Sequence, residues 1–372
     1  MKHLSKIASS VFVVVAGLAV AQTPSDPLVR QTFKETQGGW TVFGTTATLA
    51  VTHDAPVVEP GNGALKFGYS VAKGDLSALV FPTDIGSITR AKSVKFRIRT
   101  DATTMIAVML QEQDGGRYVA MCNAPKDRWQ PIELSTDDFA LAQEKDDPKD
   151  PDGKLDMDRV SGIVVTDVAQ MFAQSDDAGL RSLIGVKTGS HTLYIDDFTV
   201  GADPIHTSMV TAAGDIVLDT FAHPQLAWFG LGGGDLSRSS GKPLEGLAVK
   251  FDYHQTPNKI SLLSKGIAPG TLTGTKSLSL DMASSQPAKL VIQVEETDGG
   301  KYNMMIDLPG GSVSNHVNLP FDAFKVADDS KDANGKLDLE KIKTLLILDG
   351  SGIMDQADHD NTLWVGHVVA HK

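Results

Sequence analysis

A long internal repeat constrains this chain more than any other feature of its sequence. Lys276 lies 184 residues after Lys92, and Asp298 lies 184 residues after Asp114. An offset between 182 and 185 residues recurs at two further pairs, Phe139 with Phe324 and Asp156 with Asp338. A register held this closely over many motifs indicates a tandem duplication.

Each copy is predicted to be a series of short strands. Apolar residues alternate with polar or small ones at 65–69 and again at 249–253, the period of a half-buried strand. Asp-Gly-Gly follows a strand at 114–116 and at 298–300, where it favours a tight hairpin. The 35 glycines, 17 prolines and only 6% aromatic residues suit many strands and turns. We therefore predict an all-β chain of two tandem β-sandwich domains, most simply jelly rolls.

The composition also predicts where the chain divides. Residues 1–21 combine a basic start, an apolar stretch and the small-residue sequence Ala19-Val20-Ala21, which is typical of a secretory signal peptide. Domain 1 is expected at 22–201, a linker at 202–215 and domain 2 at 216–372. The apolar stretch is shorter than the roughly 20 residues that span a bilayer. We therefore expect a secreted or periplasmic protein, with no membrane insertion after signal removal.

Charge and cysteine content exclude several classes of partner and chemistry. The formal net charge is −12, and no cluster of basic residues is present. Nucleic acids and anionic membrane surfaces are bound through Lys and Arg, so neither is expected as a partner. Cys122, the one cysteine, cannot form an internal disulfide and lies in an apolar run, which predicts a buried and inert thiol.

Several motifs follow one another in an order that resembles a known superfamily. They are Phe33 with Trp40, a strand ending in E-x-D-G-x-x-Y, Trp129, a D-G-K-L-D loop and a closing L-Y-I-D-D-F at 193–198. This order is similar to the carbohydrate-binding jelly rolls of the galactose-binding-like superfamily, nearest to family 11 carbohydrate-binding modules and the complex-I-intermediate-associated fold. The resemblance implies a non-catalytic sugar-binding module. It also implies a structural Ca²⁺ in domain 1, held by Asp196 or Asp197; the second copy has Gly366 and His367 at that place, and no matching site is expected there.

The Asp-rich loops at 146–156 and 328–338 invite comparison with an EF-hand. With Gly153 as the sixth residue, the first position is Pro148 and the twelfth is Arg159. The second copy has Ser330 first and Lys341 twelfth. An EF-hand needs a bidentate Glu at the twelfth position. Both loops are therefore interpreted as solvated turns.

Sugar binding calls for aromatic rings to stack on pyranose faces and for polar side chains to bond hydroxyl groups. The candidate aromatic residues are Trp40, Tyr69, Trp228 and Tyr253. The candidates on the polar face of the sheet are Met109, Gln111, Gln293 and Glu295. The alternative for each Trp is a place in the core, because most aromatic side chains are buried.

The sequence thus predicts an exported, non-catalytic protein that binds a polysaccharide or cell-wall glycan. The alternative is a structural or adhesion protein of the cell envelope, in which the sandwiches are spacers or protein-contact modules. A hydrolase is not expected. The carboxylate pair of a glycosidase flanks one sugar, whereas Glu112 with Asp114 and Glu296 with Asp298 form a duplicated pair at two hairpins.

Overall fold

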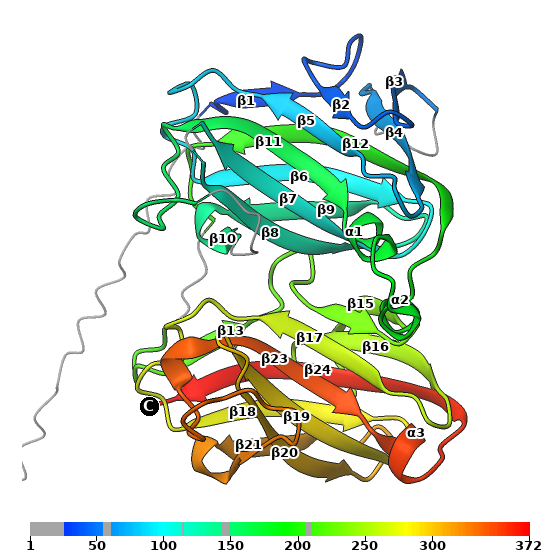
Figure 1. The fold of residues 1–372 in the computed structure, drawn as a ribbon, viewed down its shortest axis with the longest axis vertical. Coiled ribbons are helices and arrows are strands. Elements are labelled where there is room, and N and C mark those ends of the chain that lie inside the picture. Colours follow the sequence, from blue (N-terminus) through cyan, green and yellow to red (C-terminus); the bar gives the residue numbers. More distant parts are fainter. Residues whose placement is uncertain (1–25, 55–60, 114, 143–148, 206–209) are drawn as a thin grey trace, which may run out of the picture.

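The computed structural model describes residues 26–54, 61–113, 115–142, 149–205 and 210–372. It contains four antiparallel sheets, which form two β-sandwiches, one above the other in Figure 1. The predicted all-β fold of two tandem jelly-roll sandwiches is therefore confirmed. The predicted signal peptide, 1–21, lies outside the described residues.

Sandwich 1 consists of two sheets, A and B, whose strands come from residues 29–201. Sheet A has the order β3 (Thr48–Thr52), β4 (Ala64–Val71), β12 (Gly189–Gly201), β6 (Ser93–Thr100), β9 (Gln130–Ser135), and β1 (Val29–Gln31) also pairs with β12. Sheet B has the order β10 (Ala140–Leu141), β8 (Arg117–Ala124), β7 (Thr104–Glu112), β11 (Val160–Asp167), β5 (Ala78–Pro82), β2 (Thr41–Phe43).

Sandwich 2 repeats this arrangement in sheets C and D, with strands from residues 216–371. Sheet C has the order β15 (Asp235–Ser240), β16 (Leu247–Gln255), β24 (His359–His371), β18 (Ser277–Ser284), β21 (Asn315–Pro320), and β13 (Ile216–Asp219) also pairs with β24. Sheet D has the order β14 (Phe229–Leu231), β17 (Ser261–Gly266), β23 (Ile342–Asp349), β19 (Ala288–Glu296), β20 (Lys301–Leu308), β22 (Lys325–Val326). The duplication seen in the sequence is thus a duplication of the whole strand order.

The core of each sandwich lies between its two sheets, because alternate residues of every long strand point inward. In β6, Val94, Phe96 and Ile98 are buried, and in β19 Leu290, Ile292 and Val294 are buried. Burying one such side chain stabilises the fold by about 1.5–3 kcal/mol. The outward residues of the same strands are mostly less buried, although Gln293 of β19 is only 9% exposed.

In the described residues, helix is confined to short segments at the ends of strands. These are α1 (Ala169–Ala173), α2 (Ala178–Ile184) and α3 (Ser351–Met354), with 3-10 turns at Thr136–Asp138, Phe321–Ala323 and Leu339–Lys341. None of the helices in the described part of the chain has the length and apolar character needed to cross a membrane.

A buried amide joins the two sandwiches. Gln225 accepts a hydrogen bond from the backbone N–H of Glu133 at 3.0 Å and donates to the carbonyl of the same residue at 2.6 Å. Glu133 lies on β9, the edge strand of sheet A, and Gln130 of that strand donates to the Pro224 carbonyl at 2.5 Å. The Gln225 side chain thus pairs with the N–H and carbonyl groups of Glu133, which an exposed sheet edge would leave unpaired.

Candidate functional site

The four aromatic residues predicted to bind sugar lie in the cores, so this prediction is wrong as a surface assignment. Trp40 is 2% exposed and Trp228 is not exposed. The Tyr69 hydroxyl donates to Asp167 at 2.6 Å, and the Tyr253 hydroxyl donates to Asp349 at 2.5 Å, both inside the sandwiches. Burial, with the neighbouring carboxylate, raises the pKa of each phenol. Rings enclosed in this way cannot stack on a polysaccharide.

The four polar-face candidates do lie on the outward faces of sheets B and D. Met109 and Gln111 are on β7, and Gln293 and Glu295 are on β19. The Gln111 amide is folded back onto its own hairpin, where it donates to the Glu112, Gly115 and Gly116 carbonyls at 3.0–3.2 Å. Its oxygen accepts from Arg117 at 3.3 Å. Gln111 therefore holds the turn in the structure.

A row of outward side chains crosses sheet D from edge to edge, one residue per strand. Its members, given by successive cross-strand pairs, are Phe229, Ser264, Leu346, Gln293, Asn303 and Lys325. Gln293 donates to Glu295, its neighbour on the same face, at 2.6 Å. Within the described residues, Asn303 Oδ1 is buried and has no hydrogen-bond partner. The row, here named the sheet D row, thus combines one aromatic ring, an aliphatic side chain and two amides.

The corresponding row of sheet B is apolar except for Thr41. It consists of Thr41, Val80, Val164, Met109, Val119 and Ala140. Two large apolar side chains near it are exposed, Phe43 at 60% and Met121 at 44%. The two sandwiches therefore present different chemistry at the same place.

Phe229, Asn303 and Phe43 were missed by the sequence analysis. A signal was available for the first two. Phe229 follows the buried Trp228, and Asn303 follows the buried Tyr302, so strand alternation turns both outward.

Two surface hollows are found among the described residues, and the first is lined in part by the predicted residue Trp40 and by Thr41 of the sheet B row. One groove of about 700 Å³ is lined by residues 35–41 and by Leu49, Ala50 and Val51 of β3. Another, of about 490 Å³, is lined by Lys242, Pro243 and residues 312–314. Neither includes a polar candidate from β7 or β19.

The closing-strand carboxylates of sandwich 1 are close to basic and amide groups. Asp196 is fully buried; its Oδ1 accepts from the Asn62 amide at 3.4 Å and from the Asp197 backbone at 2.7 Å, and its Oδ2 lies 3.5 Å from Arg97. Arg97 therefore already balances the Asp196 charge. Asp197 Oδ1 is buried, accepts no hydrogen bond from the described residues, and lies 3.9 Å from Arg30 Nε. Of the two, Asp197 is the better fit to a calcium ligand.

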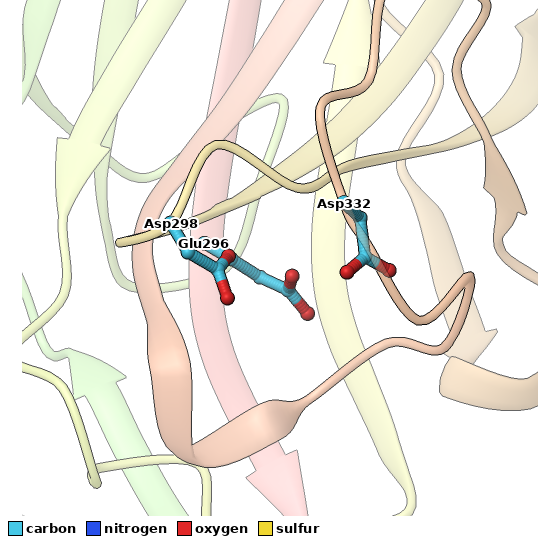
Figure 2. A group of neighbouring side chains, drawn as sticks. All are labelled: Glu296, Asp298 and Asp332. Atoms are coloured by element: carbon cyan, nitrogen blue, oxygen red, sulfur yellow. The ribbon is translucent and has the colours of Figure 1, made fainter.

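Three carboxylates meet at the β19–β20 hairpin of sandwich 2. Figure 2 shows Glu296 and Asp298 of the hairpin beside Asp332 of the following loop. One oxygen of each lies within 4.8 Å of the others, a grouping that can hold a metal ion. Burial raises the pKa of Glu296, and the hydrogen bond from Lys341 lowers the pKa of Asp298.

Comparison with protein-family models finds no match, and comparison with curated proteins finds none either. Among solved structures, the chain is similar to a family 11 carbohydrate-binding module from Clostridium thermocellum in complex with a β-1,3-1,4-mixed-linked tetrasaccharide. The two are 17% identical over 43% of this chain and 97% of the module, with a TM-score of 0.35.

Two further solved structures are similar to the chain. The tandem CBM22 domain of Paenibacillus barcinonensis Xyn10C is 11% identical over 95% of this chain and 99% of its own length, with a TM-score of 0.30. An exo-β-agarase is 15% identical over 42% of this chain and only 24% of its own length, with a TM-score of 0.34. Likenesses at this level carry no conclusion about activity, so function is argued below from the side chains.

Proposed function

We propose that this protein is exported and binds a polysaccharide or cell-wall glycan without catalysis, through the outward face of sheet D. The observation that carries the proposal is the sheet D row. Its amides at Gln293 and Asn303 can donate to and accept from sugar hydroxyls, and Phe229 and Leu346 offer apolar surface to the CH faces of the ring.

The dimensions of the row suit a chain rather than a single sugar. The row crosses six strands of sheet D, and its five interstrand steps of about 4.8 Å make it roughly 24 Å long. An extended glycan of several sugar units can lie along such a row. The Asn303 side chain is partly exposed, but its Oδ1 is buried and has no donor within the described residues. This amide has to turn outward to accept a hydrogen bond from a sugar hydroxyl, and it loses no protein hydrogen bond at Oδ1 when it does so.

The absence of catalysis is proposed from the placement of the hairpin carboxylates. A glycosidase needs two carboxyl groups that reach opposite sides of one glycosidic bond. Glu296 is 0% exposed and Glu112 is 1% exposed. Neither can contact a polysaccharide without opening the hairpin.

The proposal that the protein is exported rests on the signal sequence predicted at 1–21. The proposal that its two domains are separate rests on the boundaries predicted at 201 and 216.

The apolar row of sheet B favours a protein contact for sandwich 1. Exposed Phe43 and Met121 border aliphatic residues there, and the row itself has no amide. The structural or adhesion alternative is therefore favoured for sandwich 1, as a contact between this apolar face and another protein.

A structural calcium ion at Asp197 belongs to the same proposal. The buried Asp197 Oδ1 supplies an oxygen that no hydrogen bond from the described residues satisfies, and oxygen is the ligand that Ca²⁺ prefers. If calcium binds there, Asp197→Asn lowers the melting temperature in CaCl₂ and leaves it unchanged in EDTA.

The proposed sugar site is tested by titrating residues 22–372 with soluble mixed-linked β-glucan and other polysaccharides, using isothermal calorimetry. We expect Gln293→Ala and Asn303→Ala each to weaken binding about tenfold or more, or ~1.4 kcal/mol. Val119→Ala, at the position of sheet B that corresponds to Asn303, is the matched control. Failure of the folded chain to bind any polysaccharide, or unchanged binding by both sheet D variants, would overturn the proposal.

A further inference from the structure

The β19–β20 hairpin and the loop at 327–338 form an acidic pocket at one end of sheet D, and the pocket is open to solvent at the exposed Asp298. The backbone N–H of Lys331 donates to the Gly299 carbonyl at 3.0 Å, and the N–H of Lys301 donates to Ser330 Oγ at 2.9 Å. These bonds hold Asp332 against the hairpin that carries Glu296 and Asp298 (Figure 2). These two contacts between hairpin and loop do not involve the carboxylates of the pocket.

One oxygen in this pocket lacks a partner that its burial requires. Glu296 is 0% exposed, and its Oε1 accepts from the Asp338 backbone N–H at 2.6 Å. Its Oε2 is buried and receives no hydrogen bond from the described part of the chain. Figure 2 shows the carboxylate lying between Asp298 and Asp332. A buried acceptor without a donor costs about 1–3 kcal/mol, and more for a charged group.

The remaining contacts hold the carboxylates in place but supply only one ammonium group among the ion pairs of the described residues. Asp332 accepts from the Tyr302 hydroxyl, from the Lys336 N–H at 3.0 Å and from the Asn334 N–H at 3.1 Å. Lys341 binds Asp298 at 3.1 Å and Asp338 at 2.6 Å. The Lys341 ammonium thus pairs with two of the four carboxylates, Asp298 and Asp338.

Sandwich 1 repeats the arrangement. Glu112 is 1% exposed, its Oε1 accepts from the Asp156 N–H at 2.7 Å, and its Oε2 has no partner among the described residues. The Tyr118 hydroxyl donates to Asp150, whose Oδ1 is likewise buried with no donor from the described chain. Asp114, the counterpart of Asp298, lies outside the described residues.

In each hairpin the unpartnered oxygen occupies the space beside a glycine, where any other residue would have its Cβ. A Cβ at Gly300 would lie 2.0 Å from Glu296 Oε2, and a Cβ at Gly116 would lie 2.5 Å from Glu112 Oε2. Any larger residue would push the carboxylate out of the pocket.

We propose that Glu296, Asp298 and Asp332 bind a divalent cation, Ca²⁺, and that Glu112 and Asp150 belong to a second such site. Carboxylate oxygens are the ligands of hard cations. The three ligand oxygens all lie within 4.8 Å of one another, close enough to share one ion. Ca²⁺ accepts irregular sets of oxygen ligands, whereas Mg²⁺ demands near-ideal octahedral geometry and gives up its waters reluctantly, so Ca²⁺ is the better match to these carboxylates. The site is no EF-hand, because its ligands come from a hairpin and a separate loop.

Calcium binding to the chain of residues 22–372, stripped with EDTA, is measured by calorimetry and by the melting temperature. We expect Ca²⁺ to bind and to raise the melting temperature, and Mg²⁺ to do so less. Glu296→Gln removes one binding event or weakens it about tenfold or more, and Glu112→Gln does the same to the other. Glu245→Gln, an exposed carboxylate of sandwich 2, is the control and leaves both unchanged.

A second readout protects the test against a misfolded variant. Tb³⁺ bound in the pocket is excited through Tyr302, and Tb³⁺ in the second site through Tyr118, so the luminescence of the unmutated chain reports both sites, and added Ca²⁺ displaces it. Tyr302→Phe lowers the luminescence, and Asp332→Asn lowers Ca²⁺ affinity. The proposal fails if the stripped chain shows no heat and no change of melting temperature in millimolar CaCl₂. It also fails if the Glu112→Gln/Glu296→Gln variant responds as the unmutated chain does.

Discussion

Sandwich 1 and sandwich 2 share one strand order but place different side chains at matching positions. Across sheet D, Gln293 and Asn303 stand where sheet B has Met109 and Val119. The duplicated core pattern has kept the fold, since inward positions are apolar in both copies. The outward positions have diverged, so a function argued for one sandwich does not extend to the other.

The two core tryptophans, Trp40 and Trp228, also have different neighbours in the two sandwiches, polar in sandwich 2 and aromatic in sandwich 1. Trp228 donates to Asp219 at 2.9 Å, and Lys265 binds Asp219 at 3.1 Å while lying over the Trp228 ring. Trp40 instead packs on Phe81 and Phe198, and its N–H has no acceptor within the described chain. Gln31 and Phe81 occupy the positions of Asp219 and Lys265.

The largest expected effect comes from breaking the buried ion pair of sandwich 2. Lys265→Ala leaves Asp219, whose side chain is 12% exposed, without its cation, which we expect to cost about 3 kcal/mol of unfolding free energy, at the low end for a buried pair. Installing the sandwich 1 pair, with Asp219→Gln and Lys265→Phe together, should restore most of that stability. Urea unfolding measures both. A double variant as unstable as Lys265→Ala would contradict the equivalence of the two cores.

Next in size is the loss of a buried tyrosine hydroxyl. Tyr69→Phe removes a donor from Asp167 Oδ2 in sandwich 1, and we expect a cost of about 1–3 kcal/mol. Tyr253→Phe should cost less, because Asn361 also lies 3.5 Å from Asp349 Oδ2. Thermal unfolding of the two variants compares them; an equal or reversed order would show that Asn361 does not compensate.

The aromatic end of the sheet D row gives a smaller effect, on binding alone. Phe229→Ala should weaken glycan binding about tenfold, or ~1.4 kcal/mol, since the ring is the stacking surface of the row. Thr41→Ala changes the corresponding position of sheet B and should leave binding as it is. Titration calorimetry with the same polysaccharide decides between them, and equal losses would place the site elsewhere.

The smallest expected effect concerns one histidine. Hydrogen bonds to Asp360 and Asp358 raise the pKa of His254 above its ordinary value of 6.5. The protonated His254 pairs with these carboxylates and so stabilises the folded state. This contribution is fully present below pH 6.5 and is lost as the pH rises through the higher, folded-state pKa. Asp360→Asn should move the pKa back toward 6.5 in an NMR titration. An unchanged titration would show that the pair does not form in solution.

The fold could be predicted because the sequence alone carries its signals. Alternation and turns are local signals, and the repeat needs only a comparison of the chain with itself. Strand alternation at 65–69 and 249–253, together with Asp-Gly-Gly turns, defines strands and hairpins, and the repeat defines two copies. The short helices α1 and α3 were not predicted. They are one or two turns long and carry no apolar period of their own.

The site was harder to predict, because it depends on which face of each strand is inward. Tyr69 shares a face with Leu65 and Phe67, so alternation already placed it in the core. The contact between Glu296 and Asp332 joins residues far apart in the sequence. The interpretation of 328–338 as a solvated turn considered that loop alone, without the hairpin. Only the three-dimensional register brings Phe229 into line with Asn303.

The central claim is that glycan recognition lies on sheet D and not on sheet B. The most direct test follows the side-chain amide NMR signals of Gln293, Asn303 and Gln111 while a mixed-linked gluco-oligosaccharide is added. We expect the Gln293 and Asn303 signals to shift in a saturable way and the Gln111 signal to stay in place. Shifts confined to Gln111 and the neighbouring residues of sheet B, or no shift at any of the three, would contradict the account.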